Sequence, residues 1–188
     1  MIRKFNIFLL SLFVTTSLVA NKNDSPIIDY SAISHPEIGS KGMVVSQRKI
    51  ASEVGAQILR KGGNAVDAAV ATAFALAVVL PRAGNLGGGG FMLIYSNELK
   101  KTIAIDYREM APEKASRDMF LDRMGNYDRK KAQFSLLSAG VPGTVAGLHY
   151  ALKKYGTLSW DEVLDPAIRL AEEGFIVPHD LSSVLTNY

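Results

Sequence analysis

The residue whose type and position best suit binding chemistry in this 188-residue chain is Arg108. It follows the apolar run KTIAIDY, and the acids Asp106 and Glu109 lie on either side of it. A guanidinium at the C-terminal end of a predicted strand lies at an edge of the sheet, where it can hold a carboxylate through two parallel hydrogen bonds that lysine cannot reproduce. Spacing alone favours the other interpretation, a structural ion pair with a neighbouring acid.

Four consecutive glycines, residues 87–90, precede Arg108 by about twenty positions. A phosphate-binding P-loop needs a lysine and a hydroxyl residue directly after its glycines, but Phe91 and Met92 follow here. The dinucleotide fingerprint needs a strand before the glycines and a helix after them, and the predicted order is reversed. We therefore expect these glycines to let the chain pass close to other backbone at the start of a strand.

The histidines and the paired acids show no pattern of a catalytic or metal site. His35, His149 and His179 have neither metal-ligand spacing nor the arrangement of a triad. The pairs Asp161-Glu162 and Glu172-Glu173 are expected to cap a helix and to face solvent. The chain has no cysteine, which excludes disulfides, thiol nucleophiles and thiolate metal sites. The sequence thus predicts no catalytic residue, metal or cofactor within the chain.

The first twenty residues have the organisation of a secretory signal peptide. Arg3 and Lys4 precede an apolar core, and small and polar residues follow as far as Ala20. The alternative, a membrane anchor, requires a longer apolar segment. We expect a signal peptide at 1–20, a polar extension at 21–41 and a periplasmic or secreted protein.

The charge of the remaining residues argues against a nucleic-acid partner. Without residues 1–20 the chain has 19 basic and 18 acidic side chains, so its formal net charge falls from +3 to +1. A basic footprint for nucleic acid is then missing.

The elements that must position Arg108 begin at residue 42. MVVS predicts a short strand, and IASEVGAQILRKGG predicts a helix that buries Ile50, Val54, Ile58 and Leu59 and ends near Gly62. The run AVDAAVATAFALAVVL, capped by Asn64 with Asp67 three residues on, is apolar nearly all round. We expect it to be a buried core helix, since it is short for a membrane span.

A hairpin and further helices are predicted after the glycines. FMLIYS and KTIAIDYR form two strands joined by NELKK, and the first has the apolar run of a sheet covered on both faces. The polar stretch 114–133 is expected on the surface. VPGTVAGLHYALKKYG predicts a helix ended by Gly156, and LSWDEVLDPAIRLAEEG one that Ser159 and Glu162 cap and Pro166 interrupts. DLSSVLTNY begins another helix without a stop signal, so we expect the chain to be incomplete.

Five stretches together resemble one enzyme family. GGNAVDAAVA, AGNLGGGGFML, AIDYREMAP, KASRDMFLD and GVPGTVAGLHYALKKYG closely resemble the N-terminal part of the large subunit of gamma-glutamyltranspeptidases, also called glutathione hydrolases. The motifs follow one another in the same order, so residues 42–188 are expected to be an N-terminal segment of that subunit.

The resemblance implies an α+β fold of the N-terminal-nucleophile hydrolase type, an αββα sandwich of four layers of which only the N-terminal part is present. The family is made as a zymogen that cleaves itself into a large and a small subunit. A threonine exposed at the start of the small subunit attacks the gamma-glutamyl amide, with its own amine as the base. The acyl group then passes to water, an amino acid or a dipeptide.

The resemblance also implies a role for Arg108, the arginine of the YRE motif, which would bind the alpha-carboxylate of the gamma-glutamyl group. The threonine nucleophile, the ligands of the alpha-amino group and the oxyanion hole are expected beyond Tyr188, so the 188 residues alone are expected to be inactive. The implied substrates are glutathione and other gamma-glutamyl compounds, and the implied protein partner is the protein's own small subunit, without a cofactor.

Two alternatives stay open. One is a related N-terminal-nucleophile amidase, such as a cephalosporin acylase or a polyglutamate-processing enzyme, and the other is a non-catalytic fragment. Arg108 argues for a free alpha-carboxylate on the substrate and hence for a gamma-glutamyl enzyme. A reading frame that continues to a Thr-Thr-His motif would exclude the non-catalytic fragment.

Overall fold

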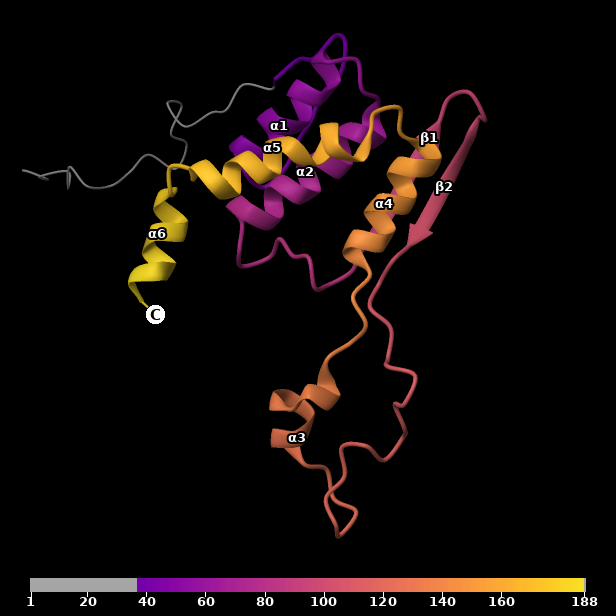
Figure 1. The fold of residues 1–188 in the computed structure, drawn as a ribbon, viewed down its shortest axis with the longest axis vertical. Coiled ribbons are helices and arrows are strands. Elements are labelled where there is room, and N and C mark those ends of the chain that lie inside the picture. Colours follow the sequence, from indigo (N-terminus) through magenta and orange to yellow (C-terminus); the bar gives the residue numbers. More distant parts are fainter. Residues whose placement is uncertain (1–36, 188) are drawn as a thin grey trace, which may run out of the picture. The chain divides into compact units, whose positions relative to one another are not determined.

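The apolar helix predicted from AVDAAVATAFALAVVL is present and lies at the centre of the helical layer. It is α2 (Ala65–Val79) in the computed structural model, which describes residues 37–187. Nearly all round it is buried, because three other helices contact it (Figure 1). These are α1 (Lys49–Arg60), α4 (Thr144–Tyr155) and α5 (Trp160–Glu173). Among helices within the described range, none combines the length and hydropathy of a membrane span.

The N-terminal predictions fall almost entirely outside the described residues. The signal peptide at 1–20, most of the extension at 21–41 and His35 belong to this part. Of the extension, residues 37–41 are described, and they are exposed.

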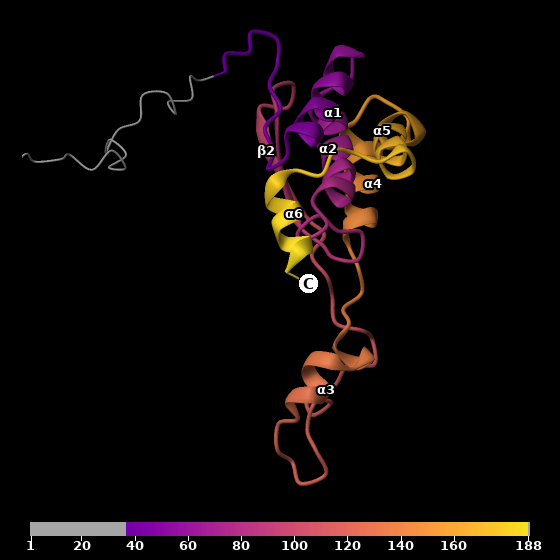
Figure 2. The same ribbon diagram turned by 90° about the vertical axis from the view of Figure 1, so that its left-hand side faces the viewer.

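Helices α1 and α2 pack tightly because small residues meet at their contact, and perpendicular views show them side by side (Figures 1 and 2). A Cβ placed on Gly55 of α1 would lie 2.8 Å from a methyl group of Val44 and would overlap the hydroxyl of Thr72 in α2. The predicted apolar face of α1 is confirmed, with Val54 and Ile58 buried and Ile50 and Leu59 half-buried against the core. The predicted end of α1 is also confirmed, since Gly62 adopts a φ of 97°, which favours glycine.

The start of α2 is tied to the connection between α4 and α5 by one buried carboxylate. Asn64 and Asp67 form the predicted capping box, in which the Asn64 N–H donates to Asp67 Oδ2 at 2.7 Å. The same carboxylate accepts hydrogen bonds from the backbone N–H of Thr157 at 2.9 Å, the Thr157 hydroxyl at 2.7 Å and the N–H of Leu158 at 3.2 Å. Asp67 is 0% exposed. This carboxylate therefore fixes where the chain passes from α4 to α5.

Helix α5 begins as predicted but does not break at Pro166. The capping box of Ser159 and Glu162 is present, and α4 ends at Gly156 as expected. The prediction of an interruption at Pro166 was wrong, because the helix is continuous from Trp160 to Glu173. A proline removes the hydrogen bond that its missing N–H would donate and crowds the carbonyl four residues earlier, but the Pro166 ring is buried, so packing offsets this cost.

The strand predicted from MVVS is absent. Residues 43–46 are extended, with exposure that alternates from residue to residue, and Val44 packs against the core. This is the pattern of a strand, but no described strand pairs with it, and pairing is what defines a strand. The prediction was wrong because the sequence pattern says nothing about whether a partner is adjacent.

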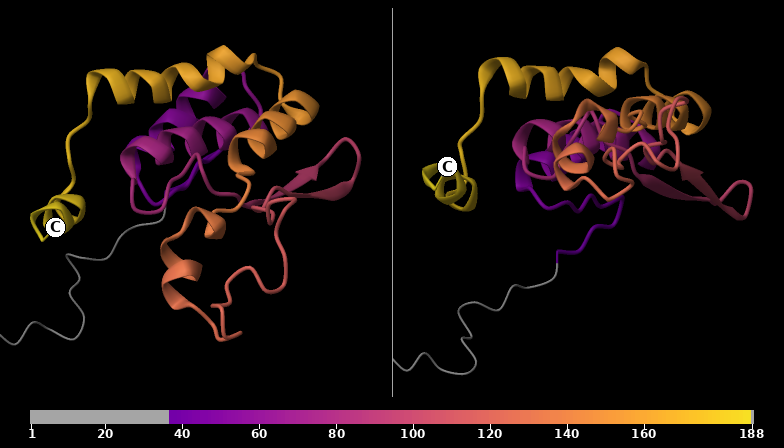
Figure 3. Two further views of the ribbon diagram at one scale, coloured as in Figure 1. Left: turned by 60° about the horizontal axis from the view of Figure 1, so that its bottom comes forward. Right: turned by 90° about the horizontal axis from the view of Figure 1, so that it is seen from below.

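The predicted hairpin is present, although only one of its faces is covered by the described residues. Strands β1 (Phe91–Ser96) and β2 (Lys101–Asp106) pair antiparallel, with Phe91 opposite Asp106 (Figure 3). Met92 and Ile105 face the core, whereas Phe91, Leu93 and Tyr95 are 63–75% exposed. The expectation of a sheet covered on both faces is therefore not met within this part of the chain.

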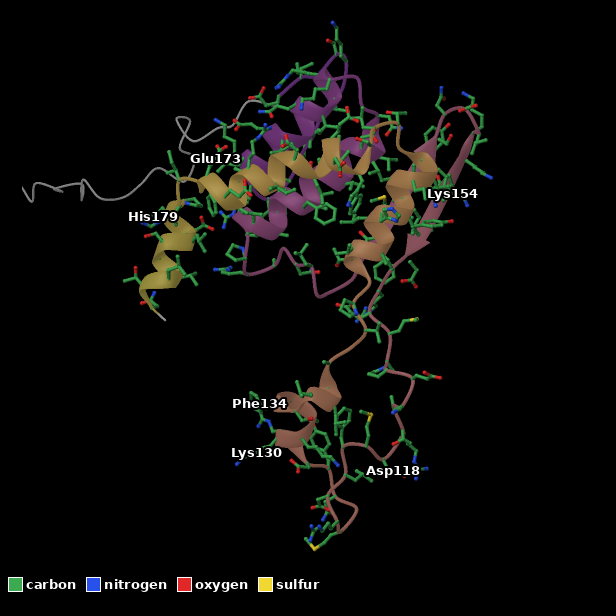
Figure 4. All side chains as sticks on the ribbon, viewed as in Figure 1. Asp118, Lys130, Phe134, Lys154, Glu173 and His179 are labelled. Carbon is green, nitrogen blue, oxygen red and sulfur yellow. The ribbon has the colours of Figure 1, made fainter. Side chains whose placement is uncertain are left out.

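The chain between β2 and α4 makes an excursion that starts and ends at one point, where Met110 and Val141 pair through their backbones. The short helix α3 (Arg129–Phe134) and the turn η2 (Leu136–Ser138) belong to it, and Phe134 and Lys130 of α3 are marked in Figure 4. Most side chains of this segment are exposed, as predicted for residues 114–133.

The last helix, α6 (His179–Thr186), confirms the helix predicted from DLSSVLTNY. It is tied to the start of α1 by an ion pair in which both terminal nitrogens of Arg48 contact the carboxylate of Asp180, at 2.7 and 2.8 Å. The Arg48 guanidinium holds the pKa of the Asp180 carboxyl below its usual value, and in return the pKa of Arg48 is raised.

We predict that Asp67→Asn lowers the free energy of unfolding by about 3 kcal/mol, since an amide cannot accept from all four donors and would turn its own NH₂ towards a backbone N–H. Chemical denaturation of the protein measures the effect. Asp118→Asn is the matched control, because Asp118 is exposed and pairs only with the adjacent Arg117. Equal losses in the two variants would contradict a structural role of the Asp67 carboxylate.

The Arg48–Asp180 pair predicts a pH-dependent contribution to stability. Because the folded-state pKa of Asp180 is lowered, the contribution is present above the unfolded pKa of about 3.9 and is lost as the pH falls through the folded pKa. The difference in melting temperature between wild type and Asp180→Asn should therefore be larger at pH 6 than at pH 3. The titration of the other acids affects both proteins alike, so it cancels in this difference. An equal difference at both pH values would show that the pair adds nothing.

Candidate functional site

Arg108 follows a backbone ladder that extends β2 by one residue. Strand β2 ends at Asp106, but the Tyr107 N–H donates to the Gly90 carbonyl at 3.0 Å and the Gly90 N–H donates back at 3.4 Å. Along this segment Ile103, Ile105 and Tyr107 are partly or fully buried, whereas residues 102, 104, 106 and 108 are exposed. Strand alternation thus places Arg108 on the exposed face of the hairpin.

Tyr107 packs against the start of α4 at two glycines, its carbonyl on the N-cap residue Gly143 and its ring on Gly147. A Cβ on Gly143 would overlap the Tyr107 carbonyl, and a Cβ on Gly147, one turn further along α4, would overlap the Tyr107 ring. Burial raises the pKa of the Tyr107 hydroxyl, which makes only a long hydrogen bond, 3.5 Å, to the carbonyl of Phe91. The ring, more than the hydroxyl, therefore anchors this residue.

The glycine segment holds the start of α4. The Gly88 carbonyl accepts hydrogen bonds from the N–H of Gly143 at 2.7 Å and of Thr144 at 3.0 Å. The side-chain oxygen of Asn85 accepts from the Gly88 N–H at 2.9 Å and from the Thr144 hydroxyl at 2.7 Å. Backbone N–H groups at the start of a helix have no acceptors within the helix, so the glycine segment supplies acceptors for those of α4.

The prediction that the glycines allow close backbone approach is confirmed at Gly89. A Cβ on this residue would lie 2.6 Å from both the Glu109 nitrogen and the Tyr107 oxygen, and 2.8 Å from Cα of Arg108. No side chain fits there without a shift of backbone. Gly87 differs, because a Cβ on it would meet nothing within 4 Å.

The guanidinium of Arg108 is exposed and has no acidic partner among residues 37–187. The adjacent Asp106 uses its carboxylate to accept the backbone N–H of Arg108 at 3.0 Å. The structural ion pair that spacing favoured is therefore not formed within the described part of the chain.

A pocket of about 550 Å³ lies between β2 and α4, and Arg108 is one of its lining residues. Tyr107, Met110, Val141 and Tyr150 also line it, so its wall is largely apolar and aromatic. Lys154, labelled in Figure 4, donates a hydrogen bond to the Tyr150 hydroxyl at 2.9 Å. Such a pocket suits a small organic molecule.

The other candidate residues lie away from this pocket. His149 stacks edge-on against Trp160 with ring centroids 5.0 Å apart, and His179 is the first residue of α6. No cluster of His, Cys, Asp or Glu that could hold a metal ion occurs within residues 37–187.

The residues that lock the backbone next to Arg108 were not predicted from the sequence. They are Tyr107 and the two glycines of α4. The spacing of Gly143 and Gly147, four residues apart in the motif GVPGTVAG, was the available signal, because such a pair leaves a notch on one face of a helix.

Comparisons with known proteins agree on one family. The sequence profile described as Gamma-glutamyltranspeptidase matches residues 51–188. The glutathione hydrolase proenzyme of Escherichia coli (strain K12) is 54% identical over 167 residues, which are 87% of this chain and 29% of that protein.

Solved structures extend the likeness to the fold. The crystal structure of Helicobacter pylori gamma-glutamyltranspeptidase has a TM-score of 0.76 and 47% identity, over 81% of this chain and 44% of that one. The cephalosporin acylase from Bacillus halodurans has a TM-score of 0.63 and 27% identity, over 86% of this chain and 32% of that one. These neighbours are N-terminal-nucleophile hydrolases, which confirms the predicted α+β fold class. The chain spans less than half the length of each of these proteins.

We predict that Gly89→Ala destabilises the protein by about 1–3 kcal/mol, because the methyl group must displace the backbone at Tyr107 and Arg108. Gly87→Ala in the same glycine run is the matched control and should change stability by about 0.5 kcal/mol or less. Thermal unfolding of both variants measures the difference. A loss no larger for Gly89→Ala than for Gly87→Ala would show that the close approach carries no energetic weight.

Proposed function

Because this chain belongs to the gamma-glutamyltranspeptidase family, we propose that the protein that carries it hydrolyses and transfers the gamma-glutamyl group of glutathione and related gamma-glutamyl compounds. The acceptors are water, amino acids and dipeptides. Support comes from the match of the family profile to most of the chain and from the 54% identity to a glutathione hydrolase proenzyme.

Within this reaction, Arg108 binds the alpha-carboxylate of the gamma-glutamyl group. The observation that carries this role is an exposed guanidinium without an acidic partner in the described chain, which directly follows a fixed backbone ladder. A guanidinium can grip a carboxylate with two parallel hydrogen bonds, which fixes both the position and the direction of the substrate. The gamma-carbonyl is then presented to the nucleophile in a constant orientation, which lowers the entropic part of the barrier.

The nucleophile is a threonine that self-cleavage exposes at the start of a small subunit. Its hydroxyl attacks the gamma-carbonyl, the amide nitrogen leaves with a proton, and water or an amine then takes the acyl group. The large and small subunits stay associated as partners. The arrangement of residues 1–20 supports export of the protein to the periplasm or the medium.

The second candidate, an amidase of the cephalosporin acylase or polyglutamate-processing type, has weaker support. The solved cephalosporin acylase is 27% identical to this chain, against 47% for the Helicobacter pylori gamma-glutamyltranspeptidase. The exposed Arg108 argues against any substrate without a free alpha-carboxylate, but not against gamma-linked polyglutamate, each residue of which carries one.

We predict that Arg108→Lys in the complete, self-cleaved protein raises the KM for gamma-glutamyl-p-nitroanilide by about 10- to 100-fold, because lysine replaces a two-point grip by a single contact. Release of nitroaniline measures the change. The control is Arg123→Lys, at an exposed arginine of the excursion between β2 and α4, which should leave KM unchanged.

Two results would contradict the proposal at separate points. An unchanged KM in Arg108→Lys would remove the carboxylate-binding role of Arg108. An active protein that remains a single uncut chain would contradict the threonine mechanism, whatever the effect of Arg108→Lys.

A further inference from the structure

We propose that Tyr107 is a positioning residue for Arg108, and that the glycine notch of α4 is the seat that lets it act. The inference rests on the proposed function, since it concerns how the carboxylate-binding arginine is held. It assigns a role in substrate binding to a residue that lies on the opposite face of the strand from Arg108.

Side chains alternate between the two faces of the extended segment that contains Tyr107 and Arg108. Gly90 and Tyr107 exchange two backbone hydrogen bonds, so the extended geometry of β2 persists through Tyr107. Neighbouring side chains of an extended segment point to opposite faces. With the Tyr107 ring packed towards α4, Arg108 must project from the other face, and a slip of one residue would exchange them.

The contact of Tyr107 with the start of α4 is rigid. Gly143 and Gly147 leave no space for a side chain between α4 and Tyr107. The start of α4 is in turn fixed by the Gly88 carbonyl, two residues before Gly90. The ring is therefore held between the ladder and the helix, and any movement of Tyr107 must move the backbone of Arg108.

The backbone that follows Arg108 is also fixed. Met110 pairs with Val141 through hydrogen bonds of 2.8 and 3.3 Å, two residues after Arg108 and two before Gly143. Arg108 thus lies in a short span that is fixed at both ends, while its own side chain forms no ion pair within residues 37–187. The guanidinium owes its placement to its neighbours' packing.

The ring and not the hydroxyl carries this role. The hydroxyl makes one long contact, to the Phe91 carbonyl at 3.5 Å, whereas the ring packs directly on Gly147. Tyr107→Phe should therefore preserve positioning and Tyr107→Ala should lose it.

The test is a double-mutant cycle in the complete, self-cleaved protein, with kcat and KM measured on gamma-glutamyl-p-nitroanilide. Tyr107→Ala is expected to lower kcat/KM about tenfold in the wild-type background, mainly through KM, and less than about twofold in the Arg108→Lys background. Tyr107→Phe should keep wild-type values. On an analogue whose alpha-carboxylate is a carboxamide, Tyr107→Ala should have little effect.

A control separates positioning from general loss of stability. Val163→Ala empties part of the core on α5, away from the hairpin, and should lower the melting temperature with little change of KM. If Tyr107→Ala fails to fold, Gly147→Ala provides the same cycle, because its methyl group displaces the ring from its seat.

Each outcome decides a different point. Coupling between the Tyr107 and Arg108 substitutions, together with wild-type behaviour of Tyr107→Phe, supports the inference. Equal effects of Tyr107→Ala in both backgrounds, or an equal rise of KM in Val163→Ala, overturn it and leave the role of Arg108 intact. No effect of Arg108→Lys itself overturns the carboxylate-binding proposal and, with it, this inference.

Discussion

The rest of the described fold depends on the hydrogen bonds that the buried carboxylate of Asp67 accepts. It closes the first turn of α2 and also accepts three hydrogen bonds from residues 157 and 158, so one side chain joins the central helix to the connection between α4 and α5. A Cβ on Gly156 would lie 2.5 Å from one of its oxygens. An acid this deeply buried is tolerated only because each of its oxygens accepts hydrogen bonds. The direction in which α4 leaves the core follows from it.

That direction matters because α4 is the surface on which the candidate site is built. Gly147 of this helix lies against the Tyr107 ring, the N-cap residue Gly143 lies against the Tyr107 carbonyl, and the first N–H groups donate to the Gly88 carbonyl. Hydrogen bonds and packing contacts therefore connect Asp67, through α4, with Tyr107, the residue before Arg108. The site depends on an apolar core, a helix start and a strand ladder that meet at one place, whereas the Arg108 guanidinium forms no ion pair within residues 37–187.

Local chemistry explains which predictions succeeded. The capping boxes at Asn64 and Ser159 and the end of α1 at Gly62 depend on residues within a few positions of one another, so their side chains alone predict them. The failures involve distant partners. Residues 43–46 have no partner strand among residues 37–187, and Pro166 stays helical because its ring is buried against other elements. Propensity is a weak guide where tertiary packing supplies the larger free energy.

The sequence by itself determined the family, the order of the elements and the identity of Arg108 as the candidate ligand of a carboxylate, because motifs, caps and periodicity are local properties of the chain. Only the tertiary structure decided that Arg108 lies on the open face of the hairpin without an acidic partner in the described chain, and that Tyr107, Gly143 and Gly147 hold it there. The physical reason is that these contacts join segments more than thirty residues apart. Their formation depends on the packing of α4 against α2, which no stretch of sequence between them encodes.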